Sequence, residues 1–79
     1  MLFLRQYDGT LRNISPDQII VVENNGILFN NDYYISFWFT TDPEFLLKAY
    51  LKVAERYAII TKEELEMELD NILKEPLWN

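Results

Sequence analysis

At Asp42-Pro43 the sequence changes from short apolar runs, separated by turn residues, to the 3.6-residue periodicity of helices. Residues 1–41 contain three pairs that are typical of two-residue β-hairpin turns: Asp8-Gly9, Asn25-Gly26 and Asn31-Asp32. A chain of 79 residues is long enough for one domain only. The sequence therefore predicts a single α+β domain over residues 1–79. In it, an antiparallel β-meander of four to five short strands (1–41) precedes two α-helices (42–79) packed on one face.

The apolar runs between the turns predict the strands. They are Leu2–Tyr7, Thr10–Ile14, Ile19–Glu23, Ile27–Asn30 and Tyr33–Thr40. With two-residue turns, Glu23 pairs with Leu28, and Leu28 pairs with Ile35. Both faces of the sheet are then apolar, and the second face carries Ile20, Val22, Ile27, Phe29, Tyr34 and Trp38. Two helices cover only one face, so we expect the N-terminal hairpin, the Leu77-Trp78 tail, a second copy of the chain or another partner to cover the other.

The helix boundaries follow from capping residues. Asp42 is the predicted N-cap of the first helix, which should end near Tyr57. Thr61 and Glu64 have the spacing of a capping box, and Pro76 should end the second helix that begins there. The apolar stripes should be buried, and they comprise Leu46, Ala49, Tyr50, Val53, Ala54 and Tyr57 in the first helix and Leu65, Leu69, Ile72 and Leu73 in the second.

The chain contains neither cysteine nor histidine. This composition excludes a thiolate nucleophile, a disulfide, and a zinc site built on cysteine or histidine. The two serines, Ser15 and Ser36, have no histidine to activate them. Neither glycine lies in a phosphate-binding pattern. We therefore expect no enzymatic activity, no catalytic residue, no bound metal and no cofactor.

Acidic residues outnumber basic residues 13 to 7, and the formal net charge is −6. The excess is concentrated in residues 60–79, which hold six acidic and two basic side chains. Phosphate backbones repel such a surface, so we expect no direct binding to DNA or RNA. The apolar runs are far shorter than the ~20 residues of a membrane span, and the N-terminus lacks the pattern of an export signal. We expect a cytoplasmic protein without a membrane contact.

Two features supply candidate partner-binding residues. Tyr34 and Trp38 share the second sheet face with Phe29, and each has a polar group on its aromatic ring, which suits an interface. Glu64 and Glu68 lie one turn apart in an acidic series outside the apolar stripe of the second helix, which also includes Glu63, Glu66 and Asp70. The alternatives are that the strand Tyr33–Thr40 is central and buried and that the acidic series is a solvated face.

These features favour a small acidic interaction protein, an inhibitor or adaptor that occludes a basic surface of a partner protein. Inhibitors from viruses and mobile elements often have this size and charge, an analogy of class only. One alternative is a homo-oligomer that binds a small ligand such as a nucleotide, with Arg5, Arg12 and Arg56 as candidate phosphate contacts. Another is a structural subunit of a larger assembly. Because a domain this small often needs extra contacts, we expect self-association, most simply as a dimer.

Overall fold

The computed structural model describes residues 1–75, which form two small sheets and two helices. The α+β class is confirmed. The strands are β1 (Phe3–Arg5), β2 (Leu11–Asn13), β3 (Ile19–Glu23), β4 (Gly26–Phe29), β5 (Tyr33–Ser36) and β6 (Ile59–Thr61). The helices are α1 (Pro43–Arg56) and α2 (Lys62–Leu73), and the short 3₁₀ turns are η1 (Pro16–Gln18) and η2 (Asn30–Asp32). Strand order is β2-β1-β6 in one sheet and β3-β4-β5 in the other.

The N-terminal strands do not form one continuous meander. β1 pairs antiparallel with β2 and parallel with β6, a strand between the two helices that the sequence analysis missed. The first hairpin closes with a three-residue loop, because Gln6 N–H donates to the Thr10 carbonyl and Gly9 has φ +88°. A glycine in the left-handed region is typical of such loops. The predicted meander of four to five strands is therefore corrected to the three strands β3-β4-β5 and a separate mixed sheet.

The register of the meander also differs from the prediction. Glu23 pairs with Gly26, so the loop between β3 and β4 is Asn24-Asn25 and not the residue pair one position later. The next connection is the three-residue turn η2, in which Asn31 and Asp32 have φ of 67° and 59°. Asparagine and aspartate adopt left-handed backbone conformations more readily than other non-glycine residues. Both predicted two-residue turns are therefore wrong. The first error shifts the pairing of β3 with β4 by two residues and leaves the faces unchanged, whereas the second moves the side chains of β5 to the opposite face relative to β4.

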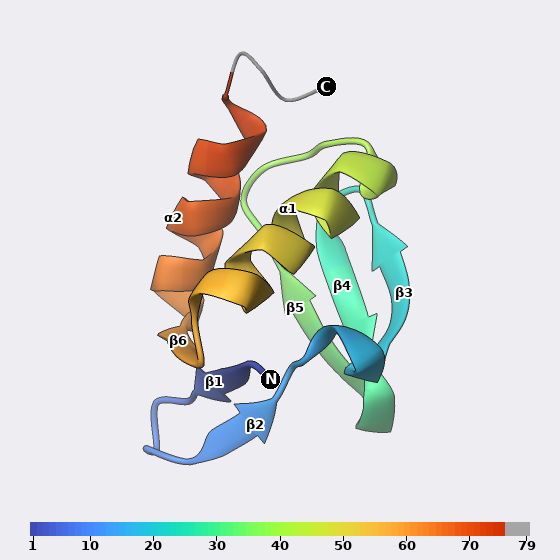
Figure 1. Ribbon diagram of the computed structural model, residues 1–79. Coiled ribbons are helices and arrows are strands. Elements are labelled where there is room, and N and C mark those ends of the chain that lie inside the picture. The colour runs from blue at the N-terminus through green and yellow to red at the C-terminus, as the bar shows by residue number, and fades with distance from the viewer. Residues whose placement is uncertain (76–79) are drawn as a thin grey trace.

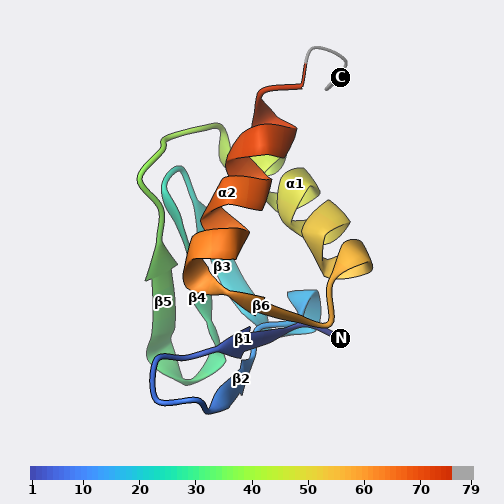
Figure 2. The same ribbon diagram turned by 90° about the vertical axis from the view of Figure 1, so that its left-hand side faces the viewer.

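Both helices lie on the same side of the β3-β4-β5 sheet, as predicted, and the β2-β1-β6 sheet lies near the ends of the helices (Figures 1 and 2). The inward face of the meander carries Val22, Ile27, Phe29 and Ile35, which pack into the core. Its outward face carries Val21, Leu28 and Tyr34. The second apolar face is thus smaller than predicted. No other segment within residues 1–75 covers this outward face (Figure 2). Pro76 and the Leu77-Trp78 tail lie outside the described residues.

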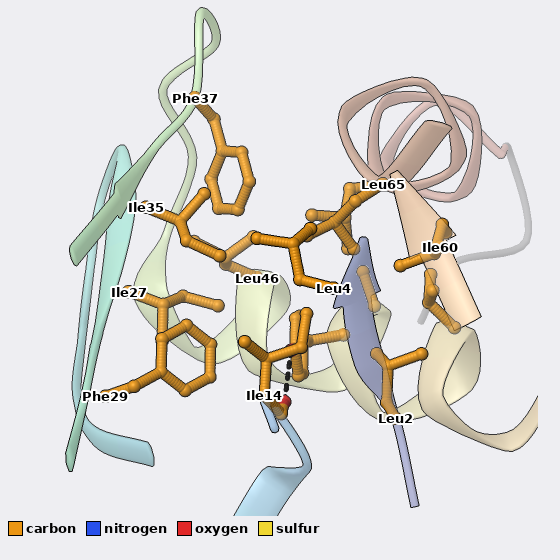
Figure 3. Close-up of a cluster of buried hydrophobic side chains, with 14 of the residues drawn as sticks. Leu2, Leu4, Ile14, Ile27, Phe29, Ile35, Phe37, Leu46, Ile60 and Leu65 are labelled. Carbon is orange, nitrogen blue, oxygen red and sulfur yellow. Dashed lines mark hydrogen bonds between the residues drawn. The ribbon is translucent and has the colours of Figure 1, made fainter. Parts of the chain in front are cut away.

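The core fills the space between the two sheets and the two helices (Figure 3). Its buried apolar side chains are Leu2, Leu4, Ile14, Ile27, Phe29, Ile35, Phe37, Leu46, Ala49, Tyr50, Val53, Ile60, Leu65, Leu69 and Ile72. The Tyr50 hydroxyl donates a hydrogen bond to the Ile14 carbonyl at the centre of this cluster. Burial raises the pKa of Tyr50 far above the ordinary tyrosine value. Most of the predicted helical stripes therefore lie in the core.

The predicted helix caps are present. The Asp42 carboxylate accepts a hydrogen bond from Glu44 N–H at 2.9 Å, at the start of α1. At the start of α2, the Thr61 hydroxyl accepts from Glu64 N–H and the Glu64 carboxylate accepts from Thr61 N–H. These bonds use backbone donors that a helix start otherwise leaves unpaired. Within residues 1–75, neither helix combines the length and the apolar character that crossing a lipid bilayer requires.

Candidate functional site

Tyr34 and Trp38 are both exposed, at 42% and 61% of their surface. Tyr34 lies on the outward face of β5 and donates a hydrogen bond to Glu23 at 3.0 Å. Trp38 follows β5, and its ring meets Phe39 edge-on with ring centroids 6.1 Å apart. Its backbone N–H donates to Glu66 of α2. The two predicted residues are therefore accessible, but Tyr34 belongs to the sheet and Trp38 to the loop that joins it to α1.

Phe29 does not join them. Its side chain is 1% exposed and lies between the rings of Tyr33 and Tyr50 in the core. The prediction placed Phe29 on the second face because it assumed a two-residue turn after β4. The observed turn has three residues, so Phe29 shares its face with Ile35, on the side that the helices cover, and Tyr34 lies on the other face. Phe29 cannot contact a partner in this fold and is removed from the candidate site.

The acidic residues of α2 have partners inside the molecule. Glu64 belongs to the capping box, and Glu68 accepts a hydrogen bond from the Tyr57 hydroxyl, which raises the pKa of Tyr57. Glu66 is buried, forms an ion pair with Lys62 at 3.1 Å and accepts the Trp38 N–H. Glu63 and Asp70 are bonded to Tyr7 and Lys74 respectively. The acidic series, which the sequence analysis proposed as a partner-binding surface, therefore also stabilises the fold, and Glu66 has the most contacts.

A different surface brings exposed apolar side chains together. A groove of about 570 Å³ runs between β3 and α1. It is lined by Pro16, Ile19, Ile20, Val21, Val22, Pro43, Glu44, Leu47 and Leu51. Ile20 and Val21 of β3 are 59% and 44% exposed, and Leu47 and Leu51 of α1 are 37% and 41% exposed. We call this surface the β3–α1 groove.

Local structure explains why three of these side chains, those of Leu47, Leu51 and Ile20, are exposed. Leu47 and Leu51 lie one helical turn apart, beside the buried stripe of α1 and not within it. The pairing of β3 with β4 shifts at Ile20, and this bulge takes the Ile20 side chain out of the regular alternation. The sequence analysis did not include Leu47 and Leu51. Their signal was present, as apolar residues at i and i+4 outside the predicted stripe.

The charge around the groove is acidic. Glu44 is the one charged residue in the lining. The residues that follow or precede a lining residue in the chain include three acids, Asp17, Glu23 and Asp42, and two lysines, Lys48 and Lys52, so the balance is negative. All four carboxylates belong to exposed residues. The Lys48 ammonium lies 3.5 Å from the Glu44 carboxylate, but both side chains are largely in solvent. Such exposed pairs hold little free energy, so Glu44 remains available to a positively charged partner.

A second cavity, of about 340 Å³, lies where β1 and β6 end side by side. It is lined by Leu4, Arg5, Gln6, Tyr7, Tyr33, Thr61, Lys62 and Glu63. Of the three arginines proposed as phosphate contacts, Arg5 lines this cavity. Arg12 stacks on Tyr33 with its guanidinium carbon 4.1 Å from the ring centre. Arg56 lies in the last turn of α1 and does not line this cavity.

These surfaces present groups that are suited to non-covalent recognition. Within residues 1–75, no cluster of three or more carboxylates could hold a metal ion. The β3–α1 groove offers apolar contact, backbone hydrogen bonding along a strand edge and negative charge. Comparison with protein-family models, with curated proteins and with solved structures finds no match to this chain.

Proposed function

We propose that the protein is a non-enzymatic interaction protein that binds an apolar, positively charged segment of a partner protein in the β3–α1 groove. The observation that carries the proposal is the groove between β3 and α1, whose lining combines exposed apolar residues of both elements with the Glu44 carboxylate. Contiguous apolar surface with a polar border is typical of protein-binding sites. By covering a basic segment, the protein would act as an inhibitor or adaptor.

The net charge of −6 supports this choice of partner. An acidic domain attracts a basic surface over long range and repels nucleic acid, so complementary charge raises the association rate with the proposed partner. The apolar groove then supplies the short-range contact. Tyr34 and Trp38 do not line the groove, and we assign them no part in this contact.

Selection of short random peptides on the immobilised protein tests the proposal. We expect enrichment of peptides that combine apolar residues with lysine or arginine and that bind wild-type protein but not the Leu47→Asp/Leu51→Asp double variant. Leu11→Asp is the matched control, because Leu11 is a leucine of similar exposure, 48%, on the distant hairpin. Each variant is first checked by thermal unfolding. Peptides that bind the double variant as well as wild type, or no enrichment at all, would contradict the proposal.

The second cavity favours another function, the binding of a small anionic ligand such as a nucleotide. Its volume of about 340 Å³ lies in the usual range for small-molecule sites. Tyr7 and Tyr33 could stack on a base, and Arg5 and Lys62 could contact phosphate. The glutamate Glu63 in the same lining weakens this candidate. Thermal unfolding with nucleoside mono-, di- and triphosphates tests this candidate. If the cavity binds a nucleotide through Arg5, the nucleotide raises the unfolding temperature of the wild-type protein and not that of Arg5→Gln.

A further inference from the structure

We infer that the occupant of the β3–α1 groove is an extended segment of the partner, which adds to β3 as a fourth strand of the β3-β4-β5 sheet. Apolar side chains on the inward face of this segment would contact Leu47 and Leu51. The inference rests on the proposed function and specifies how the partner is held.

The free edge of β3 supplies the hydrogen-bonding groups. β3 is the outermost strand of its sheet and pairs with β4 alone, so its other edge has no strand partner within residues 1–75. Proteins usually protect such edges with charged residues, with proline, with a β-bulge or with a covering segment. The strand β3 has a bulge at Ile20 and ends on Glu23, but it contains neither lysine nor proline, and its pairing is regular from Val21 to Glu23. An extended segment can therefore form backbone hydrogen bonds there, as in other cases of strand addition.

The position of α1 adds the apolar half of the site. Helix α1 crosses the inward face of the sheet near β3 (Figure 1), and Leu47 and Leu51 line the groove beside that edge. Because α1 runs obliquely to β3 (Figure 1), an added strand would meet the leucines where it passes α1, through the apolar side chains on its inward face.

The bulge at Ile20 limits the length of regular pairing. The register of β3 is regular from Val21 to Glu23 and shifts between Ile19 and Val21. Backbone pairing alone would therefore extend over few residues. The exposed Ile20 side chain adds a further apolar contact at the point where pairing is interrupted. We expect affinity to depend on the leucines of α1 as much as on the strand edge.

Charge and area argue against a second copy of this chain as the occupant. Two copies paired through this groove would bring the Glu44 carboxylates of both copies into the interface, and each copy carries −6. The four exposed apolar side chains present on the order of a few hundred Å². A stable dimer usually needs about 800 Å² from each partner. A basic peptide segment satisfies both conditions, since it neutralises the border and needs less area.

Backbone N-methylation of a selected peptide, one position at a time, tests the mode of binding. Each methyl group removes one hydrogen-bond donor. For an added strand, we expect binding to fall about tenfold or more at alternate positions, where the amide faces β3, and to change little at the positions between. Sensitivity that repeats every three or four residues, or is absent, would overturn strand addition.

The protein side of the complex supplies a second readout. On peptide binding, we expect amide hydrogen exchange to slow at those amides of Val21–Glu23 that point away from β4. The Leu11→Asp control should behave as wild type. A peptide that requires Leu47 and Leu51 but leaves exchange in β3 unchanged would refute strand addition and leave the proposed function intact. A peptide that does not require the leucines would refute the proposed function itself. The two failures are therefore distinguishable.

Discussion

The buried carboxylate of Glu66 accepts a hydrogen bond from the backbone N–H of Trp38 at 3.2 Å, and this bond joins α2 to the loop that follows β5. Lys62 pairs with the same carboxylate at 3.1 Å. A residue that sequence reasoning placed in an acidic, outward-facing series therefore connects two elements of the fold. We expect Glu66→Ala to lower the free energy of unfolding by about 2 kcal/mol, because it leaves a backbone donor without its partner.

Urea unfolding followed by circular dichroism measures this change. Glu44→Ala is the control, since Glu44 is also paired with the lysine one helical turn away but lies in solvent. If both variants unfold at the same urea concentration as the wild type, the bonds of Glu66 to Trp38 and Lys62 do not stabilise the fold.

Tyr50 makes stability depend on pH in alkaline solution. Its folded-state pKa is raised by burial above the ordinary value of about 10. The unfolded chain therefore loses the Tyr50 proton at lower pH than the folded protein does. Stability from this residue is complete below pH about 10 and is lost progressively as pH rises towards the folded-state pKa. Other tyrosines with raised pKa values, such as Tyr57, act in the same direction.

Tyr50→Phe separates the two roles of the hydroxyl. We expect a loss of about 1–2 kcal/mol at neutral pH, since the Ile14 carbonyl loses its donor, and a shallower decline of stability above pH about 10. Thermal unfolding at a series of pH values measures both. An unchanged alkaline slope would show that Tyr50 is not the group responsible.

Position 26 has no space for a side chain, because the Tyr34 side chain lies against the Gly26 backbone. A Cβ at this position would lie 2.1 Å from the Tyr34 hydroxyl oxygen and 2.8 Å from the Ile35 carbonyl oxygen. We expect Gly26→Ala to destabilise the protein by about 1–3 kcal/mol through overpacking. Adding Tyr34→Ala should restore part of this loss, because one of the two contacts is removed. Equal losses in the presence and absence of Tyr34 would assign the whole effect to the backbone contact.

Much of the helical half could be predicted because its signals are local. The caps at Asp42 and Thr61 and the buried stripes depend on residues within a few positions of one another. The sheet could not be predicted as well. The three-residue turn at Asn30–Asp32 and the pairing of β1 with β6 depend on contacts that a single sequence does not display. Phe29 was misplaced for that reason, whereas Tyr34 and Trp38 are exposed, as an interface would require.

The acidic border of the groove and the acidic series of α2 lead to opposite predictions. We expect Glu23→Gln/Glu44→Gln to slow association with a selected basic peptide at low salt and to reduce the salt dependence of binding. Glu64→Gln/Glu68→Gln removes the same charge from α2, and glutamine retains the capping oxygen. We expect this second pair to have the smaller effect. The reverse order, measured by stopped-flow kinetics, would move the docking site to Glu64 and Glu68.

The groove is tested most directly by NMR titration of the ¹⁵N-labelled protein with a selected peptide. We predict that the largest amide shifts occur in β3, at Ile20–Glu23, and around Leu47 and Leu51 of α1. Shifts that cluster instead around Arg5, Tyr7 and Lys62, or along the acidic face of α2, would contradict binding in the β3–α1 groove.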